Sequence, residues 1–230
     1  MTLGELREEV LRANLALDRH GLVTLTWGNA SGIDRDAGLV AIKPSGVSYE
    51  AMAAGDIVIV DLDGNIVEGE RRPSTDTPTH LALYRAYERI GGVVHTHSTW
   101  ATAWAQAQRE IPLLGTTHAD LAPGPIPLTR RLTAEEVAAD YEGATGELLL
   151  EVIGDADPLQ VPCALVRGHA PFCWGRDPAS AVEHAVTLEQ VARIALLTTL
   201  LDPAAAPLDE AVRNKHYQRK HGPTAYYGQP

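Results

Sequence analysis

The part of the chain that most constrains the fold is a short segment at residues 92–97, with the sequence GVVHTH. Its apolar start predicts a buried β-strand, and alternate side chains of a strand point to the same face of a sheet. We therefore expect His95 and His97 on one face, where both imidazoles can reach one metal ion. The alternative is that both are hydrogen-bonded polar residues without a metal, and a lone His-x-His motif does not decide between the two.

Two residues outside this segment favour the metal. Asp76 lies upstream in PSTDTPTH (73–80), and His169 lies downstream in RGHAPF (167–172). Three imidazoles and a carboxylate suit Zn²⁺ or another borderline divalent metal, and a ligand position left to water makes such a site catalytic. The sequence thus predicts a metal site formed by Asp76, His95, His97 and His169.

Three segments have the composition of a phosphate site: TWGNASG at 26–32, KPSG at 43–46, and Ser74-Thr75 ahead of a helix predicted to start at Thr77. Hydroxyls and exposed backbone N–H groups bind anions, and a helix N-terminus adds its dipole. Lys43 would add a positive charge. For any one of these segments alone, an ordinary turn or helix cap is the better explanation.

Acid–base chemistry is suggested by two further places. Asp120 closes the segment TTHAD, where a carboxylate among hydroxyls suits a general acid or base, or a plain helix cap. The tail from about residue 208 is rich in side chains that transfer protons, which are His216, Tyr217, His221, Tyr226 and Tyr227. Composition alone favours the alternative, that this tail is simply a solvated polar end.

The chain of 230 residues is long enough to bury one full core, and we expect a single domain over residues 1–230. A formal net charge of −11 argues against a nucleic-acid partner, because phosphate backbones bind basic surfaces. The N-terminal segment is acidic, unlike a signal peptide, and no apolar run approaches the roughly 20 residues of a membrane span. We expect a cytoplasmic protein with no membrane partner.

The pattern of apolar residues predicts alternating helices and strands. Helices are expected over about 3–20, from Thr77 to 91–92, from near Ser98, from Thr133, over about 178–201 and from about 208. Strands are expected at 22–27, 39–43, 92–97, 161–166 and 171–174, with a hairpin over 56–68 that turns at Asp63-Gly64. This order predicts a mixed or antiparallel sheet between helical layers.

Seven motifs together resemble those of the L-ribulose-5-phosphate 4-epimerase family, within the class II aldolase/epimerase/adducin superfamily. They are TWGNASG, IKPSGV, PSTDTPTH, VVHTHS, GTTHAD, HAPFCWG and the tail KHYQRKH…AYYGQ, and the resemblance runs from about Leu6 to Gln229. The His-x-His core also occurs in the sugar-phosphate aldolases of the superfamily, so it does not choose the epimerase. The TTHAD segment and the YYGQ tail are more selective.

The resemblance implies an α/β fold with three α/β/α layers and a largely antiparallel central sheet. It implies a homotetramer with active sites at subunit interfaces, and Zn²⁺ (or Mn²⁺ or another divalent metal) held by His95, His97 and His169. Asp76 is implied as an additional or alternative ligand. The implied substrate is a phosphorylated ketopentose, with L-ribulose 5-phosphate and D-xylulose 5-phosphate interconverted by retro-aldol cleavage and re-addition at C3–C4.

The resemblance also implies roles for the remaining residues. Asp120 and Tyr227 would act as acid and base, with His216 and Tyr227 supplied by a neighbouring subunit through the tail at about 208–230. The implied phosphate ligands are Asn29, Ser45, Gly46, Ser74 and Thr75, near Lys43.

Three positions depart from the family pattern, yet none removes a residue that the mechanism requires. Thr75 stands where serine is expected, Arg167-Gly168 precedes His169 without a second histidine, and Leu121 follows Asp120 where an aromatic residue is expected. The nearest alternative function is a class II ketose-phosphate aldolase. A non-catalytic adducin-like assembly protein is the alternative from another class, and a metallohydrolase is a more distant third.

Overall fold

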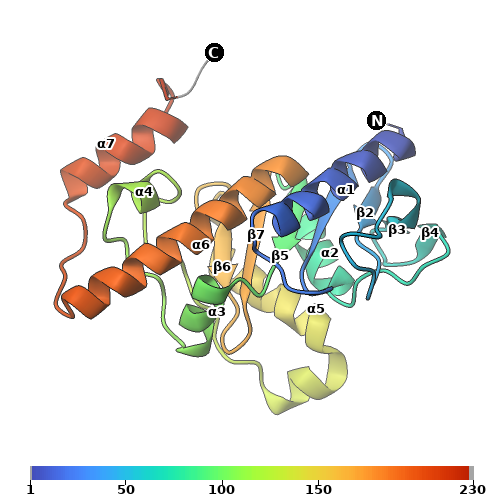
Figure 1. Cartoon of the computed structure of the whole chain (residues 1–230), viewed down its shortest axis with the longest axis horizontal. Coiled ribbons are helices and arrows are strands. Elements are labelled where there is room, and N and C mark those ends of the chain that lie inside the picture. Colours follow the sequence, from blue (N-terminus) through green and yellow to red (C-terminus); the bar gives the residue numbers. More distant parts are fainter. Residues whose placement is uncertain (1, 228–230) are drawn as a thin grey trace.

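The computed structural model describes residues 2–227, which form a seven-stranded sheet between two layers of helices (Figure 1). The strand order is β4-β3-β2-β1-β5-β7-β6, and every neighbouring pair is antiparallel. The strands are β1 (Asn29–Asp34), β2 (Leu39–Ile42), β3 (Val58–Asp61), β4 (Ile66–Glu68), β5 (Gly92–His95), β6 (Cys163–Leu165) and β7 (Pro171–Gly175). The expected three-layer architecture with an antiparallel sheet is confirmed.

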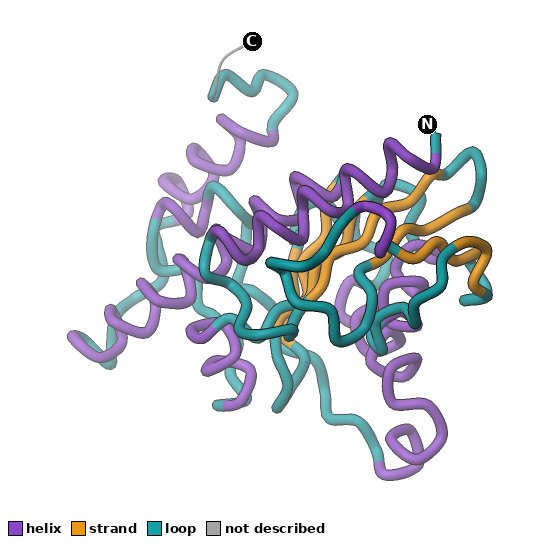
Figure 2. The backbone as a smooth tube through the Cα atoms, turned by 45° about the vertical axis from the view of Figure 1, so that its right-hand side comes forward, coloured by secondary structure: helices purple, strands orange, loops and turns teal. Residues whose placement is uncertain are grey.

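The helices cover both faces of the sheet. They are α1 (Leu3–Arg19), α2 (Thr77–Ala86), α3 (Thr99–Gln106), α4 (Thr116–Ala119), α5 (Ala134–Ile153), α6 (Pro178–Leu201) and α7 (Glu210–His221), with one 3₁₀ turn at Ala54–Asp56. Figures 1 and 2 show α1 and α6 together on one face, while α2 and α5 pack against each other on the opposite face. In the described part of the chain, no helix is long and apolar enough to cross a membrane.

Strand β5 shows how one short strand builds both cores. Val93 packs in the cluster that contains Leu83 of α2 and Leu149 of α5, whereas Val94 packs in the cluster that contains Leu17 of α1 and residues of α6. Because neighbouring side chains of a strand point to opposite faces, two adjacent valines bind the sheet to both helical layers. The apolar run before His95 therefore places the strand that ends at His95 between the two helical layers.

Several local predictions are confirmed by the structure. The hairpin between β3 and β4 turns at Asp63-Gly64, where Gly64 has a φ of +90°, a left-handed conformation that suits glycine. Helix α5 begins at the predicted cap, since the Thr133 side chain accepts a hydrogen bond from the backbone N–H of Glu136. The predicted long helix is α6, which has 24 residues.

The strand predicted at 22–27 is wrong, because the segment turns instead. The N–H of Trp27 donates to the carbonyl oxygen of Thr24, and Leu25 between them has a φ of +56° with 75 % of its surface exposed. The strand begins only at Asn29. The β-branched composition of this segment was therefore outweighed by a turn that presents Leu25 and Trp27 at the surface.

The predicted end of the second helix at 91–92 is also wrong, because α2 ends at Ala86. The guanidinium of Arg35 donates to the carbonyl oxygens of Tyr84, Tyr87 and Ile90. These bonds satisfy carbonyls at and beyond the helix end, so the chain can leave the helix without losing hydrogen bonds. The residue responsible lies about fifty positions upstream, which a local pattern does not reveal.

Gly92, the first residue of β5, packs tightly against the residues at the start of α6. A Cβ atom at this position would lie 2.4 Å from the carbonyl carbon and oxygen of Asp177. We expect Gly92→Ala to lower the free energy of unfolding by about 1–3 kcal/mol, because backbone must move to admit one methyl group. Denaturant midpoints measure this. Gly124→Ala is the matched control, since a Cβ there meets no atom within 4 Å, and equal midpoints for the two variants would contradict the expectation.

Candidate metal and phosphate site

Three imidazoles meet at one end of β5. His95 is the last residue of β5, His97 follows two residues later, and His169 lies in the turn between β6 and β7. Their ligating nitrogens all lie within 4.8 Å of one another, and the Nε2 atoms of His95 and His97 are 3.1 Å apart. The structure thus brings together the three histidines that the sequence singled out.

The strand argument for His97 is wrong in its geometry, although the two rings do meet. The ladder of β5 ends at His95, which pairs with Asn29 on β1 and Phe172 on β7. His97 lies beyond the strand, on the segment that leads into α3. Its position therefore depends on how that segment is held, and not on the alternation of a strand.

The chemical state of the rings suits a metal. The Nδ1 of His95 lies 3.0 Å from the carbonyl oxygen of Pro171, which can only accept, so Nδ1 carries the proton and Nε2 keeps its lone pair. Burial lowers the pKa of His95 to about 3, and burial also lowers the pKa of His97 and of His169. Neutral imidazole is the form that binds metals. These residues fit a divalent metal.

Asp76 lies in the same pocket, at the cap of α2. Its Oδ2 accepts a hydrogen bond of 2.6 Å from the Nδ2 of Asn29. Among the described residues, the group whose potential ligand atoms all lie within 4.8 Å of one another consists of the three histidines. Asp76 is not a member of this group. A ligand role for Asp76 remains a prediction.

The histidines open into a pocket of about 590 Å³. All the residues predicted to bind phosphate or to lie near it line this pocket. They are Asn29, Lys43, Ser45, Gly46, Ser74 and Thr75. Asn29 stands opposite His95 in the β1–β5 register, so the segment 26–32 lies directly beside the histidines. The three phosphate-type segments, ambiguous one by one, therefore converge on one cavity.

Lys43 holds the wall of this pocket. Its side chain is buried, with 2 % of its surface exposed, and Nζ donates to the carbonyl oxygens of Val47 at 2.9 Å, Thr26 at 3.3 Å and Pro44 at 3.4 Å. Burial lowers the pKa of Lys43 to about 8. Because its N–H groups already donate hydrogen bonds to carbonyl oxygens, Lys43 can act on an anion mainly through its charge.

Two residues of the pocket wall, Tyr141 and Glu142, were not predicted from the sequence. The hydroxyl of Tyr141 lies 3.3 Å from the Nδ1 of His169. Helix α5 breaks just before them, because Asp140 has non-helical angles and its Oδ1 accepts from the N–H of Gly143. An aspartate three residues before a glycine inside a helical pattern was the available indication of this break.

A second polar cluster surrounds Asp120 at the end of α4. The carboxylate accepts hydrogen bonds from the Nη2 and Nε of Arg219, at 2.6 and 3.1 Å, and from the Nδ1 of His216 at 3.1 Å. Burial opposes ionisation, but these hydrogen bonds hold the pKa of Asp120 below its ordinary value. The Tyr227 ring lies against the same guanidinium, 4.9 Å from ring centroid to Cζ. We call Asp120, His216, Arg219 and Tyr227 the tail cluster.

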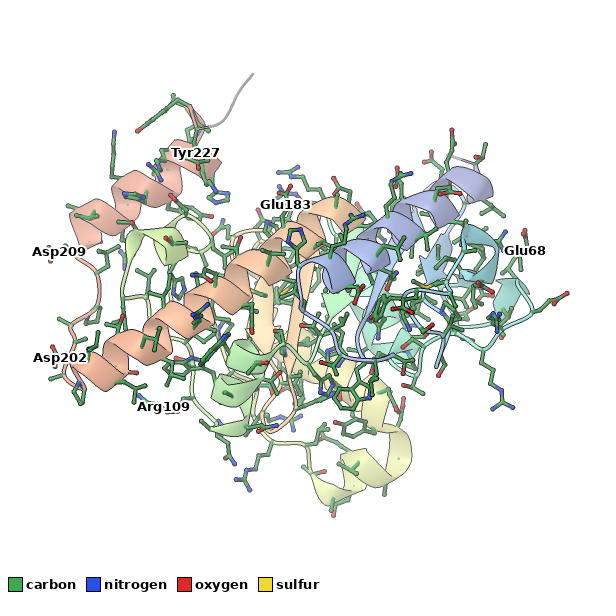
Figure 3. The ribbon with its side chains drawn as sticks, in the orientation of Figure 1. Glu68, Arg109, Glu183, Asp202, Asp209 and Tyr227 are labelled. Atoms are coloured by element: carbon green, nitrogen blue, oxygen red, sulfur yellow. The ribbon has the colours of Figure 1, made fainter. Side chains whose placement is uncertain are left out.

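The tail cluster and the metal pocket are separate within one chain. None of its four residues is among the described residues that line the pocket. Helix α7 packs against α4 at one end of the molecule, and Tyr227 lies at that end, far from Glu68 on the opposite edge (Figure 3). Asp120 therefore lies with the tail and not with the three histidines. Gly228 and Gln229 of the YYGQ segment lie outside the described residues.

Comparisons with known proteins find relatives that match most of this chain. The sequence model of the family described as "Class II Aldolase and Adducin N-terminal domain" matches residues 8–196. A protein of Salmonella paratyphi B named L-ribulose-5-phosphate 4-epimerase UlaF is 56 % identical over 225 residues, which cover 98 % of this chain and 99 % of that protein. The same name and identity recur in Salmonella typhi.

Solved structures share the fold. An L-fuculose 1-phosphate aldolase superposes with a TM-score of 0.78 at 24 % identity, covering 94 % of this chain and 95 % of the other. YgbL of Escherichia coli, titled a putative aldolase/epimerase/decarboxylase, gives a TM-score of 0.73 at 25 % identity, covering 94 % and 99 %.

Proposed function

Because this chain belongs to the class II aldolase and adducin family, we propose that it is a metal-dependent epimerase that interconverts L-ribulose 5-phosphate and D-xylulose 5-phosphate. The observation that carries the proposal is the convergence of three neutral imidazoles and three phosphate-type segments on one pocket. The identity of 56 % along the whole chain to proteins named L-ribulose-5-phosphate 4-epimerase supports the choice of substrate.

The stereochemistry of the substrate dictates the type of reaction. The C4 carbon carries a plain hydroxyl and no acidic C–H, so inversion by simple deprotonation is excluded. Cleavage of the C3–C4 bond removes the stereocentre, and re-addition to the other face of the aldehyde inverts it. Zn²⁺, or another divalent metal held by His95, His97 and His169, would supply Lewis-acid stabilisation of the negative charge that develops on the ketose oxygens.

The chain's own residues hold the phosphate and move the protons. Ser45, Ser74 and their neighbours offer hydroxyl and N–H donors that keep the phosphorylated aldehyde in the pocket while it rotates, and Lys43 adds charge. One proton-transfer group is needed on each face of the aldehyde, to take the O4 proton on one side and return it on the other. We assign these roles to Asp120 and Tyr227, with His216 hydrogen-bonded to Asp120.

This assignment requires a neighbouring subunit. Since the tail cluster lies apart from the pocket of its own chain, we propose a homotetramer in which the cluster of one subunit completes the pocket of the next. Each subunit would be one domain over residues 1–230. Its tail at about 208–230 would contribute to the active site of the neighbouring subunit. Exposed apolar side chains near the pocket and on the second half of α6 offer surfaces for such contacts. These side chains are Leu25, Trp27, Ile194, Leu197, Leu200 and Leu201.

The direct test is a coupled assay on L-ribulose 5-phosphate with purified protein, before and after chelation and again after Zn²⁺ is restored. We expect D-xylulose 5-phosphate to form only with metal, without accumulation of free glycolaldehyde phosphate. Accumulation of that fragment would identify a ketose-phosphate aldolase instead. A protein that binds no metal and turns nothing over would support the adducin-like alternative.

The charge of Lys43 predicts how substrate binding depends on pH. Because the pKa of Lys43 is lowered to about 8, its ammonium group is present below this pH and is lost above it. We expect the KM for L-ribulose 5-phosphate to rise as pH increases through about 8, measured by initial rates on both sides of this value. In Lys43→Arg the charge persists, because guanidinium stays protonated to a pH of about 12. The same rise of KM in that variant would contradict the assignment.

A further inference from the structure

His97 is the least supported of the three metal ligands. Within residues 2–227, the hydrogen bond recorded for its side chain runs to the Nε2 of His95, which is itself a proposed ligand. The strand ladder ends before His97, at His95. What holds His97 in place is therefore its backbone, which continues through Ser98 into the first turn of α3.

A carboxylate from another helix holds that first turn. Ser98 occupies the cap position of α3, but its side chain makes no capping hydrogen bond. Glu189 of α6 takes this role, because its Oε1 accepts from the N–H of Trp100 at 2.8 Å and its Oε2 from the N–H of Ala101 at 2.9 Å. A negative charge at a helix N-terminus also meets the positive end of the helix dipole.

The helix that carries Glu189 is joined to the other two ligands. Helix α6 packs on β5, which ends at His95, and on β7, which starts directly after the His169 turn. A second bond between the same helices, from the Nε1 of Trp104 to the carbonyl oxygen of Ala192 at 3.0 Å, keeps α3 against α6. Helix α6 thus connects the start of α3 to β5 and β7, the strands next to His95 and His169.

We propose that Glu189 is a positioning residue for the metal site, which sets the place of His97 by holding the first turn of α3. This role rests on the proposed function, since it presumes that the three histidines bind a metal. Glu189 is not among the described residues that line the pocket, so it would act through His97 and not by contact with metal or substrate. Its effect is to keep the third ligand at the geometry that β5 and the His169 turn impose on the other two.

The experiment compares metal affinity among oligomeric, full-length proteins. Zn²⁺ is removed from wild type and Glu189→Gln, then returned in competition with a chelating dye, and Co²⁺ absorption reports the coordination geometry. The amide keeps the shape of the side chain but loses the charge and turns one acceptor into a donor that faces a backbone N–H. We expect the dissociation constant for Zn²⁺ to rise about tenfold or more, as for other groups that orient metal-bound histidines, with a changed Co²⁺ spectrum.

Two further variants make the result decisive. Glu183→Gln removes the same charge from an exposed position of the same helix and is expected to bind Zn²⁺ as wild type does. Glu189→Asp keeps the charge on a shorter side chain, is expected to bind with intermediate affinity, and carries the comparison if Glu189→Gln does not fold.

The unfolding midpoint of each metal-free protein separates positioning from simple stabilisation. Wild-type Zn²⁺ affinity in both Glu189 variants would overturn the proposal, whatever their midpoints, because Glu189 would then only stabilise α3. If wild-type protein itself binds no metal, the proposed function fails, and the role of Glu189 fails with it.

Discussion

Exchange of His97 for asparagine is expected to remove the bound metal and to lower turnover of L-ribulose 5-phosphate by about a thousandfold or more. His97 supplies one of the three imidazole nitrogens that lie within 4.8 Å of one another, and asparagine offers no equivalent nitrogen ligand. Loss of Lewis-acid stabilisation worth several kcal/mol lowers the rate by this order, since each roughly 1.4 kcal/mol is tenfold. Metal content per subunit and initial rates measure the two effects.

The fold of this variant should persist, because His97 lies outside the sheet and is not a member of the apolar clusters that residues 2–227 form. His20→Asn is the matched control, since it removes an imidazole at the exposed end of α1. We expect the control to keep its metal and its rate. Full activity in His97→Asn would refute the metal role of the three histidines.

Local sequence predicted those parts of the fold that depend on local contacts. The cap at Thr133 and the turn at Asp63-Gly64 involve residues within four positions of each other, and both are confirmed. The end of α2 was predicted wrongly because Arg35, in the turn between β1 and β2, donates to the carbonyl oxygens of Tyr84 in the helix and of Ile90 beyond its end. The strand at 22–27 failed because the turn there outweighed the β propensity of its residues. The first error thus arose from a distant hydrogen-bond partner, and the second from a local turn that the β-branched composition of its residues did not indicate.

The candidate site divides in the same way. His95, His97, His169 and the phosphate-type loops could be predicted because the residue types themselves indicate metal and anion chemistry. Arg219 and Tyr141 could not, since an arginine in a charged tail and a tyrosine in a helix carry no such indication. Their importance appears only in three dimensions, where Arg219 joins Asp120 to Tyr227 and Tyr141 meets His169.

The separation of the tail cluster from the metal pocket predicts that two inactive variants will restore each other. Asp120→Asn is expected to lower kcat by about 10²–10⁴-fold, the usual contribution of a general acid or base. Mixed oligomers of Asp120→Asn and His97→Asn, co-expressed with different tags and purified through both, contain intact pockets facing intact clusters. In a closed ring of head-to-tail contacts with random equal mixing, roughly a quarter of the sites are wild type in both halves. We therefore expect activity near a quarter of wild type.

The matched control uses two lesions in the same half of the site. Mixed oligomers of His95→Asn and His97→Asn hold a damaged pocket at every position, so they should stay at the level of either parent. Recovery in the first mixture and not in the second assigns pocket and cluster to different subunits. Absence of recovery, with mixed oligomers present, would mean that the tail cluster serves the pocket of its own chain. The tail would then have to move toward that pocket on substrate binding, because none of the four tail-cluster residues is among the described residues that line it.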